Sequence, residues 1–150
     1  MNAITLLEDD HRKVKKLLAE GEETTERAEK TRAELYATLR REMEIHERIE
    51  EEIFYPALKA DPRASDIVLE GFEEHHVVDE IMAELGQTDV TDETWAAKFN
   101  VMKENIEHHI EEEEGEMFVE ARRAFGDEEL EELGVRMMEL KQLAQQVEAR

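Results

Sequence analysis

The chain has 150 residues, with 41 acidic and 19 basic side chains, a formal charge of −22 and no cysteine. This length suits one domain with a sizeable core, and the charge argues against nucleic acids and anionic membranes as partners. The lack of cysteine excludes disulfides, thiolate zinc sites and iron–sulfur clusters. No apolar run approaches the roughly 20 residues of a membrane span, and the N-terminus lacks the basic region of a signal peptide, so we expect a cytoplasmic protein.

The first predicted helix begins near Leu6. Thr5 and Glu8 have the spacing of a capping box, in which each side chain bonds to the backbone N–H of the other residue. The end of this helix is poorly marked, because the turn can lie anywhere within EGEETTERAEK (20–30).

Three breakers divide the rest of the chain, in which Glu, Ala, Leu, Lys and Arg favour helices. The breakers are DPRAS (61–65), GQTDVTD (86–92) and FGD (125–127). Ser65 and Asp127 are the expected N-caps of the helices that follow, and Gly86 is the expected C-cap of the helix before it.

Each of the first four helical segments places one histidine on its apolar stripe. In the fourth segment the stripe contains Trp95, Phe99, Met102 and Ile106, which recur every three or four residues. The same stripe continues to His109 and Glu113. Equivalent stripes in the other segments carry His11 in the first, His46 and Glu50 in the second, and His75 in the third.

The segments alternate in type along the chain. Residues 9–20 are similar to residues 73–84, with His11 aligned on His75, and the second and fourth segments each contain H-x-x-x-E-E. This order predicts two similar hairpins in an up-down-up-down bundle. The midpoints between consecutive histidines fall near residues 28, 60 and 92, on or near the expected turns. We therefore expect the four imidazoles in one layer, and a first helix that continues through Gly21.

The predicted fold class is all-α. We expect a single domain (1–150): an up-down-up-down antiparallel four-helix bundle at about 5–125, followed by an additional C-terminal helix at about 127–148. That helix has an apolar stripe from Leu130 to Val147, with which it should dock on the bundle or form a dimer contact. A monomer or a weak homodimer is expected.

Four imidazoles and two carboxylates in an apolar core are costly without partners. Metal ions would remove this cost, because His and Glu separated by three residues share one helical face and can converge between helices. Six such ligands are too many for one tetrahedral zinc ion. They suit two metals, each with two imidazoles, bridged by the carboxylates. Imidazole and carboxylate without sulfur fit iron or manganese.

Some nearby side chains are less clearly assigned. His76 and His108 have mostly polar neighbours on their helical faces and should be exposed to solvent. In the fourth segment Glu112, Glu113 and Glu116 all lie near the inward face, and the repeat selects Glu113.

Two further acids lie near the predicted layer. Asp79, four residues after His75, is a ligand, an acceptor for an imidazole N–H or a solvated residue; we favour the acceptor. Glu47 adjoins His46 and is a weaker candidate for contact with a metal.

The segments DDHRKV, IHERIEEEIFYP, EEHH and HHIEEEEGEMF occur in an order that resembles the hemerythrin-like, or HHE cation-binding, domain over nearly the whole chain. The resemblance implies a four-helix bundle that holds a non-haem di-iron centre. It implies the ligands His11, His46, Glu50, His75, His109 and Glu113, with Glu50 and Glu113 as the bridges.

The chain differs from the oxygen-carrying hemerythrins at two positions. Those proteins have a second histidine where this chain has Asp79. Their last carboxylate is an aspartate five residues after its histidine, whereas Glu113 comes four residues after His109. The pattern is closer to bacterial hemerythrin-like proteins and to the di-iron domain of iron–sulfur cluster repair proteins, which argues against reversible oxygen storage.

The resemblance implies two iron ions, oxo- or hydroxo-bridged, in preference to manganese or zinc. It implies a reaction with a small oxidant, and we expect catalase-like decomposition of hydrogen peroxide, although whether the protein is an enzyme stays open. The alternative is binding or sensing of oxygen or nitric oxide, or holding of iron, without turnover. A third hypothesis is a metal-free structural bundle.

Overall fold

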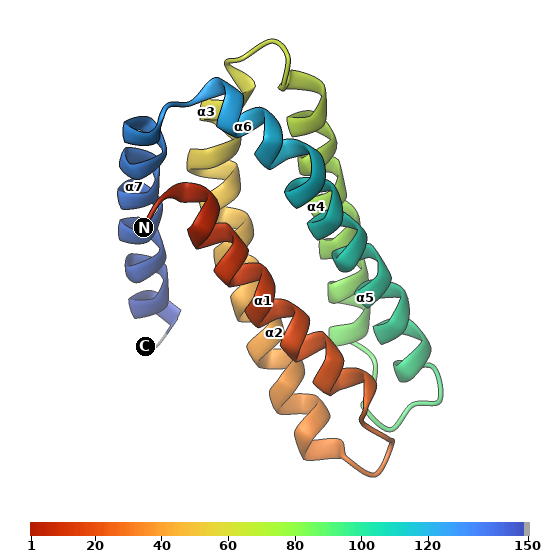
Figure 1. The fold of residues 1–150 in the computed structure, drawn as a ribbon. Coiled ribbons are helices and arrows are strands. Elements are labelled where there is room, and N and C mark those ends of the chain that lie inside the picture. The colour runs from red at the N-terminus through yellow and green to blue at the C-terminus, as the bar shows by residue number, and fades with distance from the viewer. Residues whose placement is uncertain (149–150) are drawn as a thin grey trace.

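The computed structural model describes residues 1–148, which contain helices and no strands (Figure 1). Its elements in chain order are α1 (Ala3–Glu22), α2 (Glu29–Ile49), η1 (Glu50–Phe54), α3 (Tyr55–Lys59), α4 (Ser65–Gly86), α5 (Trp95–Glu112), η2 (Glu113–Met117), α6 (Phe118–Ala124) and α7 (Asp127–Glu148). The π-helical turns η1 and η2 join their neighbours without a break, so α2–η1–α3 and α5–η2–α6 are continuous rods.

The rods alternate in direction along the bundle, and α7 lies beside one face of it (Figure 1). α1 contacts α2 and α5, and α4 contacts the same two helices. These contacts close the four rods into a ring. The predicted fold class, an all-α up-down-up-down bundle with an additional C-terminal helix, is confirmed.

As predicted, α1 continues through Gly21 and ends at Glu22. A side chain at Gly21 would overlap the ring of Phe99, so glycine allows α1 and α5 to approach closely. Arg32 then joins the two turns at this end: its guanidinium donates to the carbonyl of Val90 at 2.6 Å and lies 4.3 Å from the ring centre of Trp95.

The helix starts differ from the expected caps. α1 begins three residues early, at Ala3, because the side chain of Asn2 accepts from the backbone N–H of Thr5 at 2.8 Å; the capping box of Thr5 and Glu8 was wrong. Asparagine is as good an N-cap as serine. Ser65 and Gly86 are the first and last residues of α4 rather than its caps, and Asp127 is the first residue of α7.

The C-terminal helix docks on the bundle by its predicted stripe from Leu130 to Ala144, whereas Val147, the last predicted residue of the stripe, is exposed. α7 contacts α1, α2 and η1, and its buried side chains are Leu130, Leu133, Met137 and Ala144. A side chain at Gly134 would overlap the backbone of Met1, so this glycine lets the N-terminus cross α7 closely. Among the described residues, no helix combines the length and the hydropathy that crossing a bilayer requires.

Two separate hydrophobic clusters fill the bundle. One lies toward α3 and α6 and includes Leu7, Ile49 and Phe118; the other lies toward the opposite end and includes Leu18 and Trp95. His11 and His75 fall between residues of the two clusters along their helices, and His46 and His109 lie at the boundary, beside Ile45 of the first cluster and Ile110 of the second. The apolar core is therefore interrupted by one polar layer.

Candidate metal centre

The structure brings together all six side chains that the sequence predicts as ligands. Each is almost fully buried, with at most 3% of its surface exposed. They form two groups, in each of which one candidate ligand atom per residue lies within 4.8 Å of the others. The groups are His11, His46, Glu50 and Glu113, and Glu50, His75, His109 and Glu113. The two groups share both glutamates, which is the arrangement that two bridged ions require; metal binding itself stays a prediction for these residues.

One hairpin consists of α1, α2 and η1, and the other of α4, α5 and η2. Each hairpin supplies both imidazoles of one group, and its glutamate belongs to both groups. Glu113 Oε1 lies 2.9 Å from His11 Nε2, across the bundle, and Glu50 Oε1 lies 3.0 Å from His75 Nε2. The glutamates also lie 3.2 and 3.3 Å from the imidazole of their own helix. Each carboxylate is therefore held between imidazoles from two different hairpins.

Glu50 and Glu113 are the first residues of the two π-helical turns. A π turn contains one extra residue, so the side chains that follow it change their direction relative to an α-helix. The residues five positions after these glutamates are Tyr55 and Phe118. Tyr55 stacks on His75 with the ring centres 5.3 Å apart, and Phe118 is parallel to His11 at 5.8 Å.

Tyr55 and Phe118 thus occupy equivalent positions. The half of the layer around His75 has a hydroxyl group that the half around His11 lacks. The Tyr55 hydroxyl donates to Glu113 Oε2 at 2.5 Å and lies 3.3 Å from His75 Nε2 and 3.4 Å from His109 Nε2. Burial and the two glutamates raise the pKa of Tyr55 well above its usual value, so the hydroxyl keeps its proton. A Cβ atom at Gly71 would lie 2.9 Å from this hydroxyl, so the glycine makes room for it.

Tyr55 was not predicted from the sequence. Its position could have been noticed, because Tyr55 and Phe118 lie at the same distance from the two H-x-x-x-E-E motifs.

Each imidazole presents Nε2 to the centre and Nδ1 to an acid outside it. We call these acids the outer carboxylates; the pairs are His46–Asp10 (3.0 Å), His75–Glu51 (2.8 Å), His109–Glu74 (2.8 Å) and His11–Glu114 (2.7 Å). An ionised carboxylate only accepts, so Nδ1 carries a hydrogen in each pair and the ring orientation is fixed.

Every outer carboxylate is the immediate sequence neighbour of a predicted ligand. It contacts the imidazole of the next helix, in the cyclic order α1 to α2, η1 to α4, α4 to α5 and η2 to α1. The expectation that Asp79 accepts from an imidazole N–H was wrong: each Nδ1 has another acid as its partner, which is Glu51 for His75. A scan for acids adjacent to the ligands would have found all four.

The pKa values of the imidazoles reflect this double contact. Burial lowers the pKa of His75, but Glu50 and Glu51 accept from its two nitrogens and together raise the pKa to about 9. Burial likewise opposes protonation of His109, while Glu113 and Glu74 raise its pKa to about 11. In the metal-free protein these imidazoles are therefore protonated at neutral pH, and protons occupy the positions at which a cation would bind.

Three buried atoms in and beside the layer have no hydrogen-bond partner, namely His46 Nε2 and Glu50 Oε2 in the layer and Glu47 Oε1 beside it. The first two belong to the predicted ligands of one group. Unpaired buried polar atoms are costly, and an ion bound by imidazole nitrogen and carboxylate oxygen would remove this cost. The residues present therefore fit a pair of metal ions.

The sequence matches the model of the hemerythrin HHE cation-binding domain over residues 2–121. The chain belongs to this family. The HHE fold is also found in a crystal structure described as "Hemerythrin HHE cation binding domain-containing protein: Rv2633c homolog from Mycobacterium kansasii", with a TM-score of 0.86 and 30% sequence identity over 96% of this chain and 87% of that chain. A search of curated protein sequences gave no significant match. As an HHE domain, the chain is a metal-binding helical bundle.

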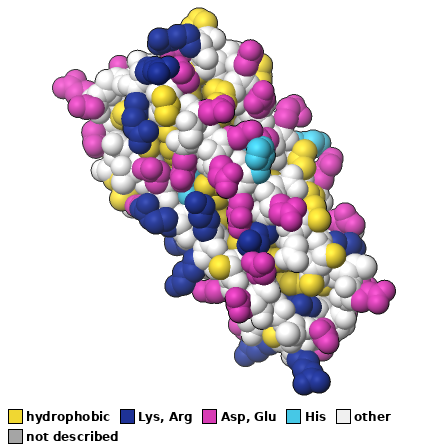
Figure 2. Space-filling view, turned by 45° about the vertical axis from the view of Figure 1, so that its right-hand side comes forward, with side chains coloured by type: hydrophobic (Ala, Val, Ile, Leu, Met, Phe, Trp, Pro, Cys, Tyr) yellow, Lys and Arg dark blue, Asp and Glu magenta, His cyan; other side chains and the backbone are white. Residues whose placement is uncertain are grey.

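The remaining candidates of this HHE domain lie outside the layer. His76 and His108 are exposed, with 67% and 65% of their side-chain surface accessible, as predicted. Acidic side chains cover much of the face shown in Figure 2 and histidines lie among them. Glu47 is buried beside Asp79, whose hydrogen bond adds to burial in raising the pKa of Glu47 to about 9. Neither acid belongs to the two groups.

Proposed function

We propose that this HHE domain is a non-haem di-iron protein with catalase-like activity toward hydrogen peroxide. The observation that carries the proposal is the pair of four-residue groups that share Glu50 and Glu113. His11 and His46 would hold one iron, His75 and His109 the other, and the two glutamates would bridge them. Bound iron would supply a pair of centres that exchange electrons with a small oxidant.

Burial of the layer supports a small substrate. At most 4% of any of the six side chains is exposed, so no organic molecule reaches them in this structure. Peroxide decomposition needs none, because one hydrogen peroxide is oxidised to oxygen while a second is reduced to water. The same burial suits oxygen and nitric oxide.

The chain's own residues prepare the site for this chemistry. The outer carboxylates keep the Nδ1 hydrogen in place and direct each Nε2 lone pair inward once the second proton has left. Phe118 covers His11 and excludes water from that half. On the other half, the Tyr55 hydroxyl is a hydrogen-bond donor that can turn from Glu113 to an oxygen atom of a small ligand.

The alternative is binding of oxygen or nitric oxide, or holding of iron, without turnover. One observation favours it: every acid that contacts the six side chains already accepts from an imidazole, so no free general base faces the centre within the described residues.

Metal analysis and an optical spectrum of freshly purified protein test the proposal. Two irons per chain with oxo-to-iron charge-transfer bands are expected, followed by oxygen evolution on addition of peroxide. Iron without oxygen evolution would support the alternative. Glu113→Leu should lose iron while His108→Leu, the exposed control, retains it. Iron-free protein from iron-rich cells, with Glu113→Leu as stable as the parent, would instead indicate a structural bundle.

A further inference from the structure

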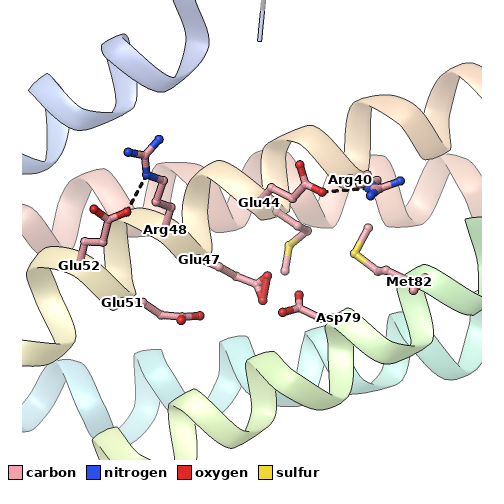
Figure 3. A pocket seen from close by; sticks show the side chains of 10 residues that line it. Arg40, Glu44, Glu47, Arg48, Glu51, Glu52, Asp79 and Met82 are labelled. Carbon is pink, nitrogen blue, oxygen red and sulfur yellow. Dashed lines mark hydrogen bonds and ion pairs between the residues drawn. The ribbon is translucent and has the colours of Figure 1, made fainter. Parts of the chain in front are cut away.

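A hollow of about 420 Å³ lies between α2–η1 and α4, beside the buried layer (Figure 3). Five acidic side chains line it: Glu44, Glu47, Glu51, Glu52 and Asp79. Such a cluster does not by itself make a binding site. What distinguishes this one is how its charges are paired.

Two of the five acids are neutralised by arginine. Arg40 Nε lies 2.9 Å from Glu44, and Arg48 Nε lies 2.6 Å from Glu52 (Figure 3). We call the other three the inner acids: Glu47, Glu51 and Asp79. Within residues 1–148, no lysine or arginine forms an ion pair with an inner acid. The hollow therefore has an inner part that is acidic and that no lysine or arginine neutralises; His75 is the one basic side chain paired there among residues 1–148.

Glu47 gives the independent indication of a ligand. Only 5% of its surface is exposed, and its Oε1 has no hydrogen-bond partner. Its carboxyl group points across the hollow toward that of Asp79 (Figure 3). Two facing acidic groups, one of them buried, are costly unless a proton or a bound cation lies between them; the hydrogen bond with Asp79 relieves part of this cost, and Oε1 of Glu47 still has no partner.

The inner acids also connect with the buried layer. Glu51 Oε2 lies 2.8 Å from His75 Nδ1, and candidate ligand atoms of Glu47, Glu51 and His75 lie within 4.8 Å of one another. Asp79 and Glu51 line a second, adjoining hollow as well. An ion held by the inner acids would thus be separated from the centre by one imidazole ring.

We propose that Glu47, Glu51 and Asp79 form an accessory site for a divalent transition-metal ion and that ions reach the buried centre through it. Carboxylate oxygens suit Mn²⁺ and Fe²⁺, and the charge of −22 attracts cations toward the hollow. The binding site does not depend on the proposed di-iron function, whereas its role in loading does.

Titration of the iron-loaded protein with Mn²⁺, followed by the EPR signal of the free ion, tests the binding site. One Mn²⁺ per chain is expected beyond the bound iron. Asp79→Asn, at an exposed position, and Glu47→Gln should each weaken that binding at least tenfold, while Glu52→Gln, whose acid is paired with Arg48, leaves it unchanged. Equal Mn²⁺ binding in all four proteins would mean adventitious binding to surface acids and would overturn the site.

The loading role is tested by mixing metal-free protein with Fe²⁺ and following the rise of absorbance. Asp79→Asn should load at least fivefold more slowly than the parent or Glu52→Gln, yet reach the same final iron content. Equal loading rates would overturn the role. A parent protein that takes up no iron refutes the di-iron function, and the Mn²⁺ titration of that protein still decides the accessory site.

Discussion

Lys141 of α7 and Asp10 of α1, 131 positions apart, form a partly buried ion pair in which Lys141 Nζ donates to Asp10 Oδ1 at 2.5 Å. The other oxygen of the same carboxylate meets His46 Nδ1 at 3.0 Å. Burial raises the pKa of Asp10, but His46 and Lys141 outweigh it and lower the pKa to about 2. The C-terminal helix therefore contributes to the contacts that orient a predicted ligand.

Lys141→Met should weaken the half of the centre that contains His46. The substitution keeps an unbranched apolar side chain, one atom shorter, and removes the charge, so Asp10 loses a partner in a buried position. We expect unfolding to become easier by about 1–3 kcal/mol and iron to be lost faster to a chelator. Thermal unfolding and iron retention measure the two effects. Lys16→Met, at an exposed position on α1, is the control. Equal losses of stability and of iron in both variants would show that α7 does not support the centre.

Tyr55→Phe should change the chemistry of the centre and lower the stability of the fold by no more than the loss of one hydrogen bond. The ring remains stacked on His75, while Glu113 loses the hydrogen bond from the hydroxyl. A hydrogen bond to a charged group contributes about 1.5–3 kcal/mol, so we expect the rate of oxygen evolution from peroxide to fall roughly tenfold to a hundredfold. Tyr36→Phe removes a hydroxyl that donates to the Met82 carbonyl and should leave the rate unchanged. If Tyr55→Phe evolves oxygen at the rate of the parent protein, the hydroxyl takes no part in the reaction.

Gly21→Ala should destabilise the bundle, because the new methyl group overlaps the Phe99 ring between α1 and α5. Overpacking of a core usually costs about 1–3 kcal/mol. Gly115→Ala is the matched control, since nothing lies within 4 Å of the added atom, and it should be neutral or stabilising by up to about 1 kcal/mol. Urea unfolding of the two variants measures the difference, and similar free energies would contradict the close approach of the two helices.

The metal-free protein should lose stability as the pH rises above neutral. The folded-state pKa of His75 is about 9, above its usual 6.5, so its contribution is complete below pH 6.5 and is lost as the pH rises through 9. The raised pKa of His109, about 11, extends the loss to higher pH. For His75 alone the loss is on the order of 3 kcal/mol. Urea unfolding at pH 6 and pH 9.5 checks the sign; stability that increases between these values would contradict the protonated imidazoles.

The helical period was sufficient to predict the fold and to bring the six side chains together. It fixes which residues share a face of one helix, and the turns fix the depth of each histidine. It fails across η1, because the residue five positions after Glu50 would lie away from the centre in an α-helix, whereas the extra residue of the π turn returns Tyr55 to it. Sequence alone gave no sign of that turn.

The helical period also does not predict which side chains of a neighbouring helix contact a given residue. Asp79 lies four residues after His75 and was expected to accept from an imidazole N–H, because metal-bound imidazoles usually donate to an acceptor. The acceptor for His75 is Glu51, which comes from another helix. Which acid reaches which imidazole is decided by how the helices rotate against one another, and a single-helix pattern carries no information on this rotation.

The cyclic order of the outer carboxylates has a consequence for assembly. Every imidazole depends on an acid from the preceding helix, so a bundle that lacks any one helix has at least one imidazole without its acid and one acid without its imidazole. The predicted ligands are therefore all held by their acids only when the four rods are present together.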